Sequence, residues 1–303
     1  MLTMIKTSDY KYCKFNFETF NPVQETCYQF FELDCNLVLS ATTSAGKTAV
    51  AEAIFGYELS TKPDKKVIYV CPLKSIAEEK RNDWKKHDTF KDYPIVVISG
   101  DNETTDEDIQ NGSIIIATVE SLNVRCRRNE EWLKNVSCFV FDEAHMISQE
   151  DRGANCEALL MAFTEQNKEC RIIFLSGTMP NTLEIAKWIK QLNGKRTQYL
   201  DSKWRPNKIH KEILSVKNSF DLQEQILDQI KSNPEEKILI FVHSKKIGEL
   251  LNKHLKKNKV KSAFFCSGIK PEIKEKMLNA FSSDTSSLNV LIATSALEMG
   301  INL

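Results

Sequence analysis

The sequence lacks the long apolar run that would cross a membrane. No stretch approaches the roughly 20 consecutive apolar residues of a transmembrane helix. The opening segment MLTMIKTSDYKYCKF also has no apolar core of the kind found in signal peptides. We therefore predict an intracellular protein, cytoplasmic or nuclear, with no membrane partner.

Paired cysteines are missing as well. The nine cysteines are scattered and odd in number, and they include no C-x-x-C pair. This distribution favours reduced thiols over disulfides. It also disfavours zinc, whose structural sites use closely paired ligands, so we predict no zinc site.

Charge of one sign does not dominate the chain, which has 41 Lys and Arg against 41 Asp and Glu. The balance is nevertheless uneven, because residues 203–303 have a net charge of +6 and residues 1–202 a net charge of −6. A basic second half would help to hold a phosphate backbone. The lysine run in this half is the alternative case. We favour a solvated helix end and turn as the interpretation of Lys253, Lys256, Lys257, Lys259 and Lys261.

Short β-rich runs alternate with longer amphipathic segments, which is the pattern of a parallel sheet covered by helices. The length of 303 residues suits two domains with a core each. Trp204-Arg205-Pro206 interrupts the alternation, so we predict an α/β fold with lobes at residues 1–202 and 203–303. Predicted strands are Cys35–Leu39, Val67–Val70, Ile95–Ile98, Ser113–Ala117, Cys138–Phe141, Arg171–Leu175, Lys211–Val216, Lys237–Val242, Lys261–Phe265 and Asn289–Ala293, and predicted helices of the second lobe are Asp221–Lys231, Lys245–Lys257 and Pro271–Phe281.

A glycine-containing loop follows the first predicted strand and precedes a helical segment. That strand, loop and helix context is typical of a phosphate loop, whose backbone N–H groups cradle phosphates. Lys47 would neutralise phosphate oxygens and Thr48 would hold Mg²⁺. The loop has Ala41 where the general pattern has glycine, so the match depends on its last three residues. The predicted ATP-binding residues are Thr42, Thr43, Ser44, Ala45, Gly46, Lys47 and Thr48.

Two adjacent carboxylates follow the apolar strand Cys138–Phe141. In α/β proteins, ligands bind where the carboxyl ends of the strands meet. Asp142 would ligate Mg²⁺ through water, and Glu143 would polarise the water that attacks the γ-phosphate. An isolated Asp-Glu pair would equally fit a solvated helix start, but its combination with the phosphate loop favours a nucleotide site.

With these two motifs the sequence resembles the DExH-box helicases of superfamily two, most of all their Ski-like subgroup. That likeness implies two RecA-like lobes of the P-loop NTPase fold, the second incomplete. It adds His145 of the Asp142–His145 box to the catalytic residues. It also assigns adenine recognition to Gln24 of Phe20-Asn21-Pro22-Val23-Gln24, and the coupling of hydrolysis to lobe movement to Ser176, Gly177 and Thr178.

Further segments resemble the family motifs that hold the nucleic-acid backbone. Hydroxyl groups, glycine turns and helix N-termini are suited to phosphates and read no base sequence. Each segment alone is an ordinary helix cap or turn, and only their order along the chain indicates a shared role. The implied contacts are Pro72, Leu73, Lys74, Ser99, Gly100, Thr118, Glu120, Ser244, Lys245, Ser267, Gly268 and Thr294. Arg152-Gly153 and Ser202–Pro206 are further Ski-like segments.

The resemblance stops within the motif that begins at Thr294, because the sequence ends at Leu303. The arginines that such motors direct at the γ-phosphate come later in the family, and the last arginine here is Arg205. An arginine finger contributes on the order of 10³ to 10⁵ in rate. We therefore expect ATP binding without the cation that supports fast hydrolysis, and a fragment of a longer motor rather than a natural short form.

Three functions fit these observations. The first is a helicase that uses ATP and Mg²⁺ to move, by resemblance 3′ to 5′, along single-stranded or partly duplex nucleic acid. DNA is favoured by the likeness of the F-N-P-V-Q and W-R-P segments to repair helicases, whereas T-S-A-G-K-T resembles RNA-handling members. The second is an ATP-dependent binding module without efficient turnover. The third, a P-loop ATPase without a nucleic-acid role, requires the other resemblances to be accidental.

Overall fold

The computed structural model describes residues 4–100, 104–177, 179–283 and 285–294. The chain divides into two compact units, residues 1–208 and 209–303. Both units contain a parallel sheet with helices on its faces, so the predicted α/β class is confirmed. No described helix is both long and apolar enough to cross a membrane.

The first unit has a seven-stranded sheet of order β3-β4-β2-β5-β6-β1-β7, and all of its strand pairs are parallel. A helix or 3₁₀ turn follows each strand from β1 to β6 along the chain, as expected for repeated βα units. Its strands are β1 Asn36–Ala41, β2 Lys66–Cys71, β3 Ile95–Ile98, β4 Ile114–Thr118, β5 Val136–Phe141, β6 Arg171–Ser176 and β7 Thr197–Ser202. Its helices are α1 Pro22–Tyr28, α2 Lys47–Thr61, α3 Lys74–Lys86, α4 Asp106–Asn111, α5 Val119–Arg127, α6 Gly153–Gln166 and α7 Thr182–Asn193, with 3₁₀ turns η1 Thr7–Asp9, η2 Glu131–Asn135 and η3 Ala144–Ser148.

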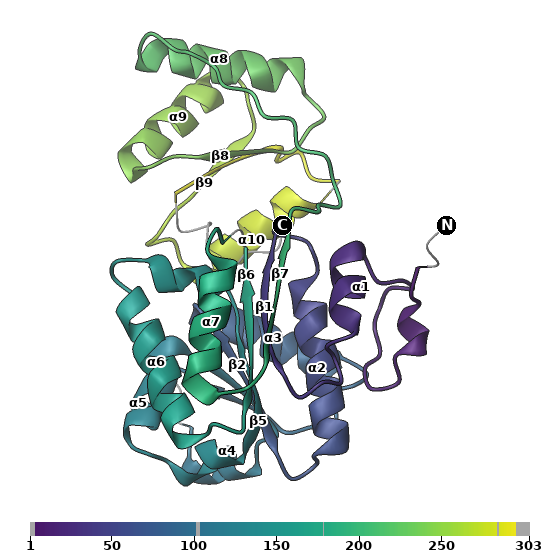
Figure 1. The fold of residues 1–303 in the computed structure, drawn as a ribbon. Coiled ribbons are helices and arrows are strands. Elements are labelled where there is room, and N and C mark those ends of the chain that lie inside the picture. The colour runs from purple at the N-terminus through teal and green to yellow at the C-terminus, as the bar shows by residue number, and fades with distance from the viewer. Residues whose placement is uncertain (1–3, 101–103, 178, 284, 295–303) are drawn as a thin grey trace. The chain divides into compact units, whose positions relative to one another are not determined.

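Side chains of the buried strands alternate between two apolar clusters, one on each face of this sheet. Leu37 and Leu39 join the cluster of α1, α2 and α3, and Val38 between them joins the cluster of α5, α6 and α7. The helices accordingly cover both faces (Figure 1). This two-sided burial explains why strands such as β1 are buried along their whole length and mostly apolar.

The second unit has a three-stranded parallel sheet of order β8-β10-β9. Its strands are β8 Ile238–Phe241, β9 Ser262–Phe265 and β10 Val290–Ala293, and its helices are α8 Ser219–Ser232, α9 Lys245–Lys257 and α10 Pro271–Ser282. Leu227 of α8 and Leu251 of α9 pack in one apolar cluster, whereas Phe281 of α10 packs in another. Helices therefore cover both faces of this sheet as well.

One predicted strand was wrong, and one strand of the structure was not predicted. The segment Lys211–Val216 forms no strand, and each of its residues is exposed, including Ile213 at 98%. Its apolar residues suggested a strand, but no described strand lies beside it, and a strand needs a hydrogen-bonded neighbour. Conversely, β7 was not predicted because TQYLDS is largely polar. It pairs at the sheet edge with β1, where its side chains stay half-exposed.

Gly56 of α2 gives a stability prediction, because a Cβ at this position would lie 2.2 Å from the backbone oxygen of Tyr12. Helix propensity alone predicts that Gly56→Ala stabilises the protein by about 0.5–1 kcal/mol. We expect the opposite, a loss of about 1–3 kcal/mol from overpacking, measured by urea unfolding. The exposed residue Ser60→Ala in the same helix serves as the control, and a Gly56→Ala protein more stable than wild type would refute the close packing.

Candidate functional site

The phosphate loop connects β1 to α2 with the geometry that a tight turn requires. Gly46 has φ of +74° and is the N-cap of α2, and a Cβ there would lie 2.2 Å from Gln24 Nε2. Both facts favour glycine at this position. Lys47 Nζ donates to the backbone oxygens of Ala41 at 3.0 Å and Thr42 at 3.3 Å. The lysine thus folds back onto its own loop, while Thr43 and Ser44 are exposed.

Two residues at the N-terminus of α1 form hydrogen bonds to the phosphate loop. Asn21 caps α1 in a capping box with Gln24. Asn21 Nδ2 then donates to Ala45 O at 3.0 Å, and Gln24 Nε2 donates to Gly46 O at 3.2 Å. Gln24 is buried and lies against the phosphate loop, and its recognition of adenine stays a prediction. The contact of Asn21 was not predicted, although its N-x-x-Q spacing is the signal of a capping box.

The predicted catalytic carboxylates lie directly beyond β5. Asp142 Oδ1 accepts a hydrogen bond from the Glu143 backbone N–H at 2.9 Å, and Oδ2 accepts one from the Tyr69 hydroxyl at 2.5 Å. Burial, and then the charge of Glu143, raise the pKa of Asp142, whereas these two hydrogen bonds and Lys47 lower it. Only β6 separates β5, which ends at this box, from β1, which ends at the phosphate loop, so both segments lie at the same edge of the sheet.

The pKa of Glu143 is lowered, whereas that of Asp142 is raised. Its side chain lies 3.3 Å from Nδ1 of His145. That contact first, and the charge of Lys47 after it, hold the pKa of Glu143 below its ordinary value against the effect of burial. The same contact raises the pKa of His145. Glu143 also has φ of +49°, a conformation rare for a non-glycine residue and often associated with functional sites.

The segment predicted to couple hydrolysis to movement begins at the end of β6, next to β1. Ser176 pairs with Ser40 in the sheet, and among the described residues its buried hydroxyl has no hydrogen-bond partner. Ser40 Oγ donates to Gly177 O at 3.1 Å and accepts from Met179 N at 3.1 Å. The sequence had not indicated this link from β1. Thr178 lies outside the described residues.

Predicted nucleic-acid contacts of the first unit follow three neighbouring parallel strands, so they lie at one edge of the sheet. Pro72, Leu73 and Lys74 follow β2, Ser99 and Gly100 follow β3, and Thr118 ends β4. Thr118 caps α5 by accepting from Ser121 N, and Glu120 is in the first turn of that helix. Ser99 is buried at 5% exposure, which makes its side chain a less accessible contact than we predicted.

Arg152 joins two of these loops. Its Nη2 donates to Pro72 O at 2.8 Å and to Glu120 Oε1 at 2.9 Å. Arg152 follows η3 of the carboxylate box and is the N-cap of α6. The next residue is Gly153, where a Cβ would lie 2.3 Å from Ile147 O. One side chain therefore ties two segments that we predict to contact nucleic acid to the segment that follows the Asp142–His145 box.

We expect Arg152→Ala to weaken binding of single-stranded DNA about tenfold, since charge-assisted hydrogen bonds contribute roughly 1.5–3 kcal/mol. ATP affinity should stay at the wild-type value. Fluorescence anisotropy of a labelled oligonucleotide measures the first quantity. Lys195→Ala, which removes a 2.6 Å ion pair with Asp34 near the amino end of β7, is the control. Equal DNA affinity in Arg152→Ala and wild type would contradict this role.

The predicted contacts of the second unit also share a sheet edge. Ala293 of β10 pairs with Phe241 of β8 and with Phe265 of β9, so the carboxyl ends of the three strands are aligned. Beyond these ends lie Ser244, which caps α9 by accepting from Ile247 N, and Lys245, the first residue of that helix. The other predicted contacts beyond these strand ends are Ser267, Gly268 and Thr294. Gly268 has φ of +94°, and the Thr294 N–H donates to Phe265 O. Residues 295–303 lie outside the described part of the chain.

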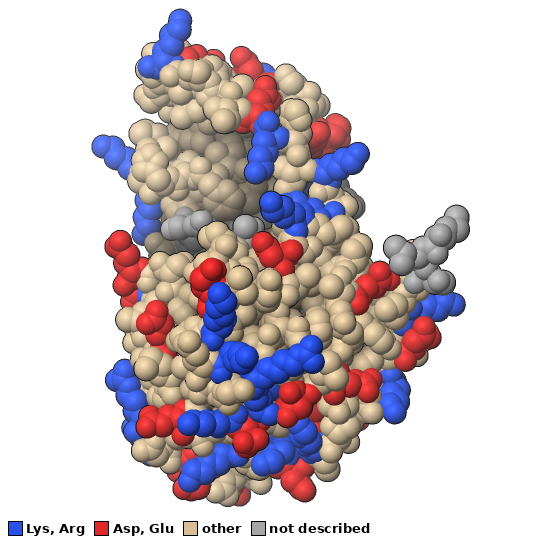
Figure 2. All heavy atoms as spheres, in the orientation of Figure 1, with Lys and Arg blue, Asp and Glu red and all other residues tan. Residues whose placement is uncertain are grey.

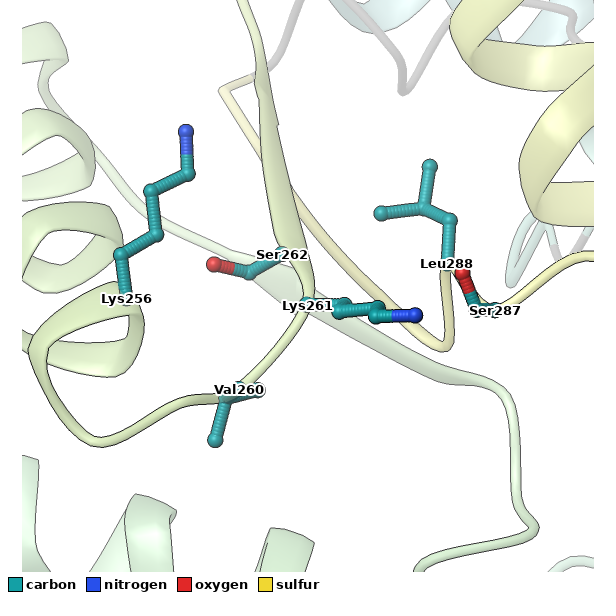
Figure 3. Close-up of a pocket in the computed structure, with 6 residues that line it drawn as sticks. All are labelled: Lys256, Val260, Lys261, Ser262, Ser287 and Leu288. Carbon is teal, nitrogen blue, oxygen red and sulfur yellow. The ribbon is translucent and has the colours of Figure 1, made fainter.

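A groove of about 410 Å³ lies at the opposite, amino end of β9 and β10 (Figure 3). It is lined by Lys256, Val260, Lys261, Ser262, Ser287 and Leu288.

On the face drawn in Figure 2, basic and acidic side chains are interspersed rather than separated. Among the described residues on that face, Figure 2 shows no broad basic surface.

Comparisons with known proteins agree with this geometry. The family model described as DEAD/DEAH box helicase matches residues 21–186, and that of the helicase conserved C-terminal domain matches residues 219–303. The chain is 31% identical to the ATP-dependent DNA helicase Hel308 of Thermococcus kodakarensis, over 71% of this chain and 19% of the relative. It is 29% identical to the antiviral helicase SKI2 of Saccharomyces cerevisiae, over 72% of this chain and 16% of that protein.

Solved structures include one of similar fold. A crystal structure of the DUF1998 helicase MrfA bound to DNA and AMPPNP superposes with a TM-score of 0.76 at 16% identity, and the match covers 94% of this chain and 43% of that one. At that identity the likeness concerns the fold alone. The chain spans between about a fifth and a third of the length of four Hel308 relatives that it matches.

Proposed function

Because the chain belongs to the DEAD/DEAH box helicase family, we propose that it is an ATP-dependent helicase or translocase that acts on DNA in the 3′-to-5′ direction. In this proposal residues 1–202 form the ATP-binding lobe, and residues 203–303 belong to the second lobe. The observation that carries the proposal is a shared sheet edge. The phosphate loop, the Asp142 box and the three segments that we predict to contact nucleic acid all lie at the carboxyl ends of one parallel sheet.

ATP would lie along the phosphate loop with its phosphates at the N-terminus of α2, where N–H groups and the helix dipole favour anions. Lys47 would exchange its bonds to the loop carbonyls for bonds to phosphate oxygens. Gln24 would contact adenine from α1. Glu143, ionised at neutral pH because its pKa is lowered, would accept a proton from the attacking water.

Mg²⁺ fits the oxygen groups at this site. The buried Asp142 carboxylate uses one hydrogen bond on each oxygen, which leaves lone pairs for a metal-bound water. The Thr48 hydroxyl has no hydrogen bond within the described residues. Hard oxygen ligands in small number are what Mg²⁺ takes in phosphate-transfer sites. When bound, the ion would neutralise charge on the phosphates.

Preference for DNA is supported by relatives that are DNA helicases by name. RNA is the alternative within the same family, since a U5 small nuclear ribonucleoprotein helicase and a pre-mRNA-splicing factor are also similar to this chain. The 2′-hydroxyl is the group that lets proteins tell the two apart. Competition of matched DNA and RNA single strands for this chain tests the preference, and tighter binding of RNA would reverse it.

Strand displacement tests the proposed activity and its direction together. The chain is mixed with ATP, Mg²⁺ and a partial duplex that has a 3′ or a 5′ single-stranded tail, and release of the labelled strand is followed. We expect release from the 3′-tailed substrate and none with Lys47→Ala. Release from the 5′-tailed substrate alone would overturn the direction.

A second candidate is an ATP-dependent nucleic-acid-binding module without efficient turnover. Residues 206–303 contain no arginine, so an arginine finger, which accelerates phosphoryl transfer, would have to come from outside these residues. The two candidates differ in a single measurement. The module would bind nucleic acid with an affinity that depends on ATP, yet nucleic acid would not stimulate ATP hydrolysis.

A further inference from the structure

Tyr69 of β2 is a buried residue next to the nucleotide site to which the family resemblance gave no role. Its side chain is fully buried, and its hydroxyl donates to Asp142 Oδ2 at 2.5 Å. Such short distances are typical of an O–H group bound to an ionised carboxylate. Tyr69 and Val140 are paired in the adjacent strands β2 and β5, so the sheet itself holds the phenol beside the end of β5.

Aromatic packing fixes the position of that hydroxyl. The Tyr69 ring makes edge-to-face contacts with Trp84 at 5.1 Å and with Phe55 at 6.4 Å between ring centroids. Trp84 is held in turn by its Nε1, which donates to Glu52 Oε1 of α2 at 2.8 Å. The phenol therefore has little freedom to move, and a carboxylate bonded to it inherits this rigidity.

The two hydrogen bonds on Asp142 act at different oxygens. Oδ1 is held by the N–H of Glu143 and Oδ2 by Tyr69. With both oxygens held, the plane of the carboxylate is fixed before any ion binds. Partners that orient a metal-binding carboxylate in this way typically contribute 10- to 100-fold in metal affinity or activity.

We propose that Tyr69 is a positioning residue that presets the Asp142 carboxylate for Mg²⁺ in the nucleotide site. This inference rests on the proposed function, because it concerns the metal that accompanies ATP. It predicts a defect that is confined to the metal-dependent part of nucleotide binding. A hydroxyl that only stabilises the fold would affect nucleotide binding equally with and without Mg²⁺.

The test compares wild type with Tyr69→Phe, which keeps the ring and removes the hydroxyl. Affinity for a fluorescent ADP analogue is measured without metal and then over a range of Mg²⁺ concentrations. For Tyr69→Phe we expect unchanged affinity without metal and about tenfold more Mg²⁺ at the midpoint. In an Asp142→Asn background, the same substitution should change nothing further.

Tyr10→Phe is the matched control. Tyr10 is also buried, and its hydroxyl donates to a backbone oxygen of α2, Ala53 O, at 3.0 Å. This variant should lose stability without a change in the Mg²⁺ midpoint. Thermal unfolding of both variants separates a folding defect from a metal defect.

Three outcomes would overturn the inference. A wild-type Mg²⁺ midpoint in Tyr69→Phe would show that the hydroxyl does not position Asp142, and an equal loss of affinity with and without metal would show that it acts on the fold. Both outcomes leave the proposed function intact. A wild-type chain whose nucleotide affinity depends neither on Mg²⁺ nor on Lys47 would overturn the proposed function and this inference together.

Discussion

Glu143→Gln is expected to lower nucleic-acid-stimulated ATP hydrolysis by about 10²- to 10⁴-fold, the usual contribution of a general base. Glutamine has nearly the same shape but cannot take a proton from water. Glu143 is suited to that task because the contact with His145 first, and then the charge of Lys47, keep its pKa below the ordinary value. The carboxylate is therefore ionised throughout the neutral range.

ATP binding should survive this substitution, because the phosphate loop and Asp142 are unchanged. Turnover is measured as phosphate release at saturating ATP, and affinity is measured with a fluorescent nucleotide. The exposed Glu131→Gln, which breaks only a surface ion pair with Lys134, should match wild type in both. If Glu143→Gln hydrolysed ATP at the wild-type rate, another group would have to be the base.

Arg171→Met is expected to destabilise the first unit by about 3–5 kcal/mol, the typical cost of removing one partner of a buried ion pair. Arg171 and Glu58 are 0% and 1% exposed, with 3.4 Å between Nη1 and Oε1. The guanidinium also donates to the backbone oxygens of Phe30, Phe31 and Cys35. Its loss leaves two buried acceptors and one partly buried acceptor without that donor. Glu58 keeps its ion pair with Lys62.

Urea unfolding followed by circular dichroism measures this effect. Lys91→Ala removes the exposed ion pair with Asp88, which should leave the unfolding midpoint unchanged because surface pairs contribute little. A similar midpoint for Arg171→Met and wild type would show that the buried pair merely offsets its own desolvation.

Strands buried on both faces could be predicted from sequence because most residues in them are apolar. β2 and β4 were therefore recognised to within one residue at each end. β7 could not be recognised in this way, since a half-exposed edge strand has polar residues on one face. The segment 211–216 shows the reverse error, because its apolar residues contact no described strand.

The candidate site was predictable where a motif lies on one continuous segment. The loop at Gly46 and the box at Asp142 depend on local sequence, and their positions at the sheet edge follow from the fold. Tyr69 and Arg152 contact the site from positions 73 and 80 residues away in sequence from their partners Asp142 and Pro72. Such long-range contacts depend on strand order, which the order of residues along the chain does not reveal.

The most direct test of the account is the rate of ATP hydrolysis by this chain with and without single-stranded DNA. The account predicts turnover that DNA stimulates and that Lys47→Ala and Glu143→Gln each abolish. Intact ATP binding with no stimulation by DNA or RNA would contradict a motor and would favour the binding module.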